Sequence, residues 1–98
     1  MITLKVTVNG GKAPKDILVH IENLKNTHDI SYTKPNSFNQ DHDLPSGEYV
    51  LIVTGMNPNA VGANTEISIT GDFSTAPVPK SPVKKATQIF SAAFYFII

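Results

Sequence analysis

Residues 43–53, DLPSGEYVLIV, join a turn to a strand and decide the fold prediction. Pro45 has a φ that suits the first position of a turn, and Gly47 can take the positive φ that follows it. From Tyr49 onward both alternating sets of side chains are apolar, which is typical of a strand covered on both faces. Because this pattern ends at Gly55, the sequence predicts a central strand over residues 49–54.

Alternating apolar and polar residues predict further strands on either side of this segment. The predicted strands cover 2–9, 17–22, 29–33, 37–40 and 66–70, and the last one covers 87–98. No window of eleven or more residues has the spacing of an amphipathic helix. About six or seven short strands separated by turn signals indicate an all-β chain folded as a two-sheet antiparallel β-sandwich.

A chain of 98 residues suits one domain, and we expect residues 1–98 to form it. Three prolines (Pro77, Pro79 and Pro82) predict that residues 74–86 form an extended connector before the last strand. Residues 55–64 contain many turn formers and no periodicity, so we expect an exposed loop there.

The composition argues against several classes of partner. Basic and acidic residues balance at eight each, and every basic residue is a lysine. Without net charge or arginine, the chain lacks the field and the bidentate donors that favour nucleic acid. The most apolar run, residues 89–98, is far shorter than the ~20 residues of a membrane-spanning helix. We therefore expect neither nucleic-acid binding nor membrane insertion.

Several segments together carry a family resemblance: Val6 to Gly11, Ala13 to Ile21, Ser37-Phe38, and the motif LPSGEY at 44–49. In this order the chain resembles the carboxypeptidase regulatory domain-like modules, which belong to the prealbumin-like sandwiches and are related to transthyretin-like and collagen-binding B-type modules. The resemblance implies a prealbumin-like or immunoglobulin-like topology and an extracellular or cell-surface location. The chain departs from the pattern with Asn36-Ser37, where Asp-Gly is common.

The resemblance does not extend to an active site. The transthyretin-like hydrolases end in Tyr-Arg-Gly-Ser, whereas this chain ends in YFII at residues 95–98. His20 lies within a predicted strand and faces away from the core if Val19 and Ile21 face inward. No serine, histidine and acid have the spacing of a nucleophilic triad, and no phosphate-binding loop is present. We therefore expect a protein that is not an enzyme and has no cofactor.

The segment Asp41-His42-Asp43, with His28-Asp29 on a neighbouring segment, is the one cluster of side chains suited to a metal. Calcium takes six to eight oxygen ligands, and zinc requires several imidazole or thiolate ligands. The three residues supply too few ligands by themselves. The sequence therefore favours a solvated turn, and Asp41, His42 and Asp43 remain weak metal candidates.

The last predicted strand has two apolar faces, whereas a sandwich covers one face of each sheet. Phe94, Phe96 and Ile98 form one set, and Tyr95 and Ile97 form the other. Either the second set lies under the proline-rich segment, or Phe94 to Ile98 form an interface with a protein partner or a second copy. Such a contact would use the sheet face or a free strand edge.

Together these observations predict a non-enzymatic structural or protein-binding module, a component of a bacterial surface or extracellular assembly. The alternative is a small carbohydrate- or metal-binding domain that uses the loops 36–43 and 57–64. A sugar site requires an exposed aromatic platform, and Tyr32 is the candidate nearest to these loops.

Overall fold

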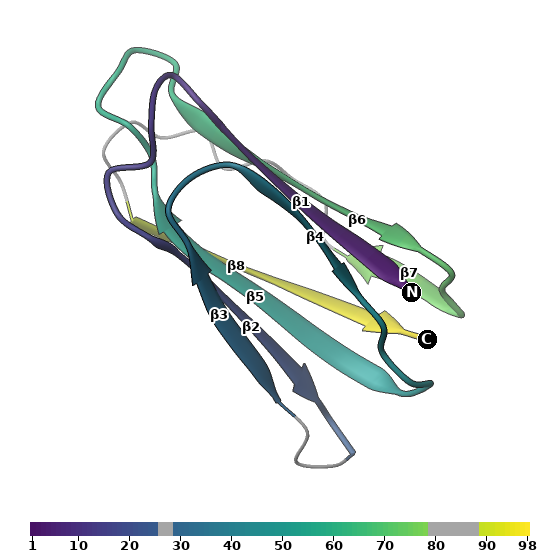
Figure 1. Ribbon diagram of the computed structural model, residues 1–98. Coiled ribbons are helices and arrows are strands. Elements are labelled where there is room, and N and C mark those ends of the chain that lie inside the picture. Colours follow the sequence, from purple (N-terminus) through teal and green to yellow (C-terminus); the bar gives the residue numbers. More distant parts are fainter. Residues whose placement is uncertain (26–28, 79–88) are drawn as a thin grey trace.

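The computed structural model describes residues 1–25, 29–78 and 89–98, which contain eight strands and no helix (Figure 1). The strands are β1 (Ile2–Asn9), β2 (Ile17–Asn23), β3 (Ile30–Lys34), β4 (Phe38–His42), β5 (Glu48–Met56), β6 (Asn64–Gly71), β7 (Thr75–Val78) and β8 (Ile89–Ile97). The all-β prediction is confirmed. Within the described residues no helix has the length and hydropathy needed to cross a membrane.

The strands form two antiparallel sheets, as expected for a sandwich. One sheet has the order β4-β1-β6, and the other has the order β3-β2-β5-β8-β7. In the larger sheet β5 pairs with β2 on one side and with β8 on the other along nearly its whole length. The prediction of a central strand over residues 49–54 is therefore confirmed. Figure 1 shows the smaller sheet stacked face to face on the larger one.

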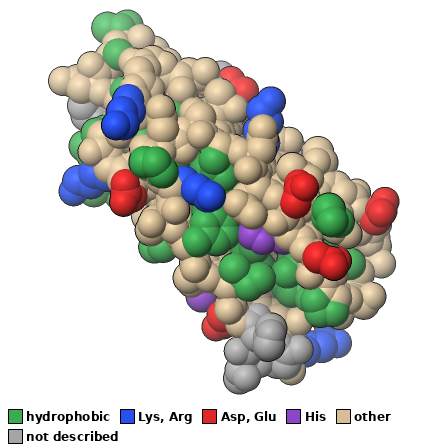
Figure 2. Space-filling model, in the orientation of Figure 1, with side chains coloured by type: hydrophobic (Ala, Val, Ile, Leu, Met, Phe, Trp, Pro, Cys, Tyr) green, Lys and Arg blue, Asp and Glu red, His purple; other side chains and the backbone are tan. Residues whose placement is uncertain are grey.

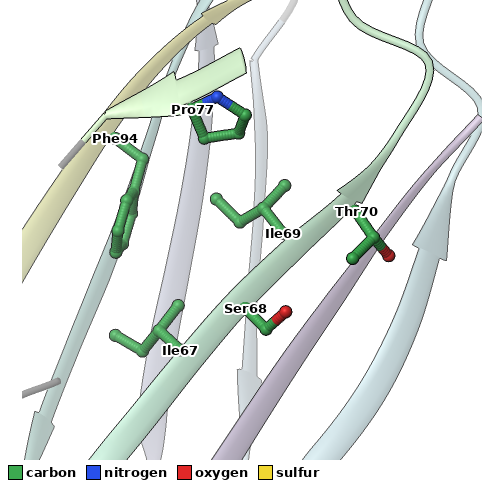
Figure 3. A pocket seen from close by; sticks show the side chains of 6 residues that line it. All are labelled: Ile67, Ser68, Ile69, Thr70, Pro77 and Phe94. Atoms are coloured by element: carbon green, nitrogen blue, oxygen red, sulfur yellow. The ribbon is translucent and has the colours of Figure 1, made fainter. Parts of the chain in front are cut away.

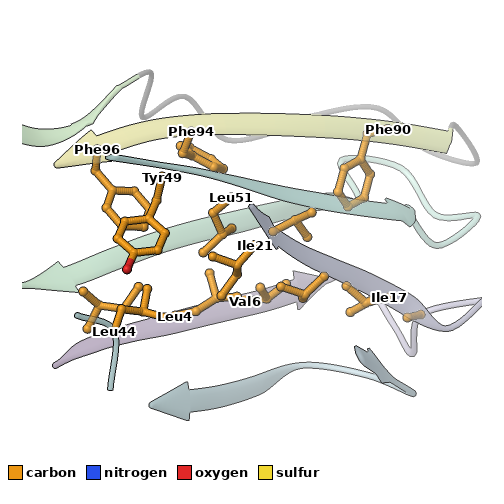
Figure 4. Close-up of a cluster of buried hydrophobic side chains, with 14 residues drawn as sticks. Leu4, Val6, Ile17, Ile21, Leu44, Tyr49, Leu51, Phe90, Phe94 and Phe96 are labelled. Atoms are coloured by element: carbon orange, nitrogen blue, oxygen red, sulfur yellow. The ribbon is translucent and has the colours of Figure 1, made fainter. Parts of the chain in front are cut away.

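The core lies between the two sheets and consists of inward-facing apolar side chains (Figure 4). On β5, the alternation of buried and half-buried residues puts Tyr49, Leu51 and Val53 inside. The cluster contains Ile2, Leu4, Val6, Ala13, Ile17, Val19, Ile21, Leu44, Tyr49, Leu51, Val53, Phe90, Phe94 and Phe96. Burial of each large apolar side chain contributes about 1.5–3 kcal/mol, which makes this cluster the main source of stability.

The turn before β5 forms as expected, but Gly47 has a different role from the predicted one. Gly47 does not adopt a positive φ. Instead, an added Cβ would lie 3.3 Å from Nδ2 of Asn23 and 3.6 Å from the ring of Tyr49. The hydroxyl of Tyr49 donates to the carbonyl of Pro45 at 2.6 Å, an arrangement typical of the tyrosine corner of Greek-key sandwiches. A larger residue at position 47 would therefore press against the Asn23 side chain.

The segment between β5 and β6 is not the exposed loop that the sequence predicts. Asn57 is fully buried and Ala63 is 1% exposed, whereas Val61 lies at an open tip. The oxygen of the Asn57 side chain accepts a hydrogen bond of 2.5 Å from the Thr65 hydroxyl. Because Ala63 packs against Gly10, which has a φ of +100°, the segment folds back onto the turn after β1.

The predicted connector at residues 74–86 begins with a strand. Thr75–Val78 pairs with the end of β8 and forms the outer edge of the larger sheet. Pro77 is compatible with this position because an edge strand has one side free of ladder hydrogen bonds. The rest of the connector, residues 79–86, lies outside the described residues.

Candidate functional site

The structure separates His42 from Asp41 among the three residues proposed as weak metal candidates. Asp41 and His42 are neighbours on β4, so their side chains point to opposite faces of the sheet. The carboxylate of Asp41 accepts a hydrogen bond of 2.7 Å from the hydroxyl of Thr3 on the outer face. His42 points inward and is 8% exposed, so the prediction of a solvated turn is wrong for this residue. Across the described residues, no group of three potential ligands comes together.

His42 contacts Tyr32, which lies within β3, in agreement with the predicted strand over residues 29–33. The Tyr32 hydroxyl oxygen lies 2.8 Å from Nε2 of His42, and the Tyr32 ring packs edge-on against Phe38. Lys34 lies 5.7 Å from the centre of the Tyr32 ring. Burial raises the pKa of Tyr32 to about 12, so the hydroxyl keeps its proton at neutral pH. Tyr32 is half-buried among these side chains and is not an open platform for a sugar.

The pH dependence of stability tests the burial of His42. Burial lowers the pKa of His42 below its usual 6.5, although the charge of Asp41 partly opposes this. Above about pH 6.5 both folded and unfolded chains carry the neutral imidazole. Below that value the unfolded chain takes up a proton more readily than the folded chain, so the free energy of unfolding falls.

We expect the wild-type chain to lose more stability between pH 7.5 and pH 5 than the His42→Gln variant. Urea denaturation at a series of pH values measures this difference. His20→Gln serves as the control, because His20 lies on the outer face with its Nδ1 2.6 Å from the Ser31 hydroxyl oxygen. Equal pH dependence in wild-type and His42→Gln chains would contradict the assignment.

The two loops proposed for ligand binding only partly come together. Asn36 accepts a hydrogen bond from the backbone of Ala13, and Gly11 lies close to Pro58, so these segments share one end of the sandwich. His42 lies at the other end of β4, opposite Ile2 in the ladder. Loops 36–43 and 57–64 therefore do not enclose a common site that includes the Asp41-His42-Asp43 segment.

The residues proposed for an interface on the last strand divide between the two faces of the sheet. Phe94 and Phe96 are buried in the core. Ile98 follows the end of β8 and forms two backbone hydrogen bonds with Gly47. Tyr95 and Ile97 lie half-buried on the outer face. Because this end of β8 is paired with both β5 and β7, it cannot present a free edge to a partner.

The outer face of the larger sheet carries an apolar surface that extends beyond these two residues. Val50, Ile52 and Met56 of β5 lie beside Tyr95, Ala93 and Ile89 of β8 in the ladder. Leu18 on β2 and Val78 on β7 are 43% and 57% exposed. We call this set, with Ile97, the outer apolar face. The sequence indicates this face, because in both β5 and β8 most residues that alternate with the core-facing ones are apolar as well.

Charged groups lie at one end of the outer apolar face. Glu48 accepts a hydrogen bond of 3.1 Å from the hydroxyl of Tyr95 and forms an ion pair of 3.2 Å with Lys25. These contacts with Lys25 and Tyr95 lower the pKa of the Glu48 carboxyl, so it stays charged at neutral pH. On the face shown in Figure 2, acidic and basic side chains are scattered, without a large area of one sign. This visible face therefore offers no charged patch that competes with the apolar surface as a contact.

A pocket of about 280 Å³ opens between the edges of the two sheets (Figure 3). Ile67, Ser68, Ile69 and Thr70 of β6 line one wall, and Pro77 and Phe94 line the other. Its volume lies at the lower end of the ~300–1,000 Å³ of ligand pockets, and its lining is largely apolar, so it can accept a few apolar side chains. It lies on the side of the sandwich away from Tyr32 and His42.

The fold and these surfaces define a two-sheet antiparallel β-sandwich with apolar surface on the outside of its larger sheet. The chain matches no protein-family model, and neither a curated protein nor a solved structure is significantly similar to it. The resemblance to the carboxypeptidase regulatory domain-like modules therefore stays a prediction.

Proposed function

We propose that this chain is a non-enzymatic structural or protein-binding module that makes its contacts through the outer apolar face. The supporting observation is the set of apolar pairs on the outer face of β5 and β8, in which Val50 lies opposite Tyr95 and Met56 opposite Ile89. One polar pair, Thr54 and Ser91, interrupts this set. Exposed apolar patches of this kind mark interaction surfaces in soluble proteins. In line with the family resemblance, we place the module in a bacterial surface or extracellular assembly.

The size of the outer apolar face supports this proposal. With nine residues each, β5 and β8 give it a length of about 30 Å, and neighbouring strands ~4.8 Å apart give a width of about 20 Å. This part of the sheet, polar side chains such as Thr54 and Ser91 included, covers about 600 Å², which is close to the ~600–1,000 Å² per partner of a typical specific interface. A second copy of the chain is the first partner to test, since Lys25 and Glu48 offer both charges at one rim.

Light scattering after size-exclusion chromatography tests this contact. We expect the mean mass of the wild-type chain to rise with concentration, because apolar faces associate by excluding water. Ile52→Lys places a charge at the middle of the face, and we expect it to lower the mass about twofold at the same concentration. Thr7→Lys, on the outer face of the smaller sheet, is the matched control. A strict monomer at every concentration, or equal masses for the two variants, would contradict the proposal.

A further inference from the structure

Strand β6 is the least protected edge within the part of the chain that the structure describes. Proteins commonly protect sheet edges with short strands, prolines or charged side chains, especially lysine. The other three edge strands have such features: β7 contains Pro77, β3 ends at Lys34-Pro35, and β4 has five residues with Asp41 among them. By contrast, β6 runs for eight residues without proline or lysine, with Glu66 as its one charged side chain, and β1 is its neighbour in the ladder.

The pocket lies directly beside this edge (Figure 3). Ile67 and Ile69 point inward from β6, whereas Glu66, Ser68 and Thr70 are exposed on the outer face. A strand added to the edge would continue the alternation of side chains, so every second residue would point into the space that Pro77 and Phe94 close from the other sheet. The edge and the pocket therefore accept a strand with apolar residues at alternate positions.

We propose that the occupant is β6 of a second copy, paired antiparallel about a two-fold axis at Ser68. In this register Ile67 of one copy lies opposite Ile69 of the other, and Glu66 lies opposite Thr70. Each copy then supplies the alternating isoleucines that the other copy's pocket requires. Because the axis makes the contact reciprocal, both pockets are filled by the same arrangement.

The sequence of β6 favours this register over its neighbours. Inward-facing residues of one copy must lie opposite inward-facing residues of the other. A two-fold axis at any residue of β6 meets this condition, so the axes at neighbouring residues are the registers to compare. An axis at Glu66 would place that acid opposite its own copy, and an axis at Ile69 would place Glu66 opposite Asp72. Like charges directly opposite each other are destabilising. An axis at Ile67 avoids this conflict but places Ile69 opposite Thr65, whereas the axis at Ser68 matches isoleucine with isoleucine.

Cysteine cross-linking tests this contact cleanly, because the chain has no cysteine of its own. Ser68→Cys places two thiols at the axis, where opposite Cβ atoms lie ~4.5–5.5 Å apart, close to the distance that a disulfide spans. Under mild oxidation we expect Ser68→Cys to dimerise about tenfold or more faster than Asn39→Cys, since pairing raises the effective concentration of the thiols. Asn39 is the matched control, because it is exposed on β4 at the other edge of the same sheet.

Two further variants test the register. Glu66→Cys and Thr70→Cys should each cross-link slowly alone and rapidly when mixed, since residue 66 lies opposite residue 70. Ser68→Cys combined with Ile52→Lys should cross-link as fast as Ser68→Cys itself, which separates this contact from the outer apolar face. If Ser68→Cys reacts no faster than Asn39→Cys, two copies do not pair through β6 and the proposal is overturned. An extended segment of another protein would then be the remaining partner for this edge. Rapid self-cross-linking of Glu66→Cys would also overturn it.

Discussion

Replacing Phe96 with alanine lowers the free energy of unfolding by about 3–5 kcal/mol. The side chain is 0% exposed and is among the largest in the core. Its ring stacks on Tyr49 with centroids 5.6 Å apart (Figure 4). It also meets the ring of Phe73 edge-on, with centroids 5.4 Å apart. The substitution removes both ring contacts and leaves a cavity between the sheets, which the rigid strands on either side cannot close.

Urea denaturation followed by circular dichroism measures this loss. The neighbouring Ile97→Ala variant is the control, because Ile97 is half-buried on the outer face. We expect it to lose about 1 kcal/mol or less, since it removes less buried surface and leaves no internal cavity. Equal losses for the two variants would show that β8 does not have the orientation described above.

Replacing Asn57 with alanine is expected to lower the free energy of unfolding by about 2–3 kcal/mol. Asn57 and Thr65 are both 0% exposed, and their side chains share a hydrogen bond. A buried polar group that loses its partner is destabilising by about 1–3 kcal/mol, and the shortened side chain leaves unfilled space as well. The expected loss is large for a segment that the sequence suggests is solvent-exposed.

A double-mutant cycle measures the coupling between these two residues. Asn57→Ala and Thr65→Val are expected to cost less together than the sum of their separate losses, because both substitutions remove the same hydrogen bond. Asn59→Ala, at an exposed position of the same segment, should change the free energy of unfolding by about 0.5 kcal/mol or less. Additive losses for Asn57→Ala and Thr65→Val would contradict the assigned hydrogen bond.

The strands of the core could be predicted because their signal is local. In β1 the alternation of Ile2, Leu4 and Val6 with polar residues states directly which side faces the core, and the structure confirms it. In β5 the side chains that point to each face are mostly apolar, and this pattern predicted a strand covered on both faces. The side chains that point away from the core, such as Val50 and Ile52, belong to the outer apolar face. An alternating pattern in the sequence appears as one buried and one exposed face in the structure, because successive side chains of a strand point to opposite faces.

The candidate sites were harder to predict because they depend on contacts between distant segments. Asp41-His42-Asp43 reads as a polar turn, yet β4 extends to His42 and turns the imidazole inward to Tyr32. Asn57 reads as a loop former, yet Thr65 and the turn at Gly10 hold that segment inside. Neither partner is recognisable from spacing along the chain, since each is brought close by strand pairing.

The sequence by itself determined the class of fold, the strands other than β7, and most of the apolar side chains that face inward, because alternation and turn residues act over a few neighbouring positions. Only the tertiary structure decided that β8 lies between β5 and β7, and that β6 lies at the edge of the smaller sheet, beside a pocket. Strand order follows from pairings between residues far apart in the chain. Such pairings depend on how all the strands pack together, so no short stretch of residues encodes them.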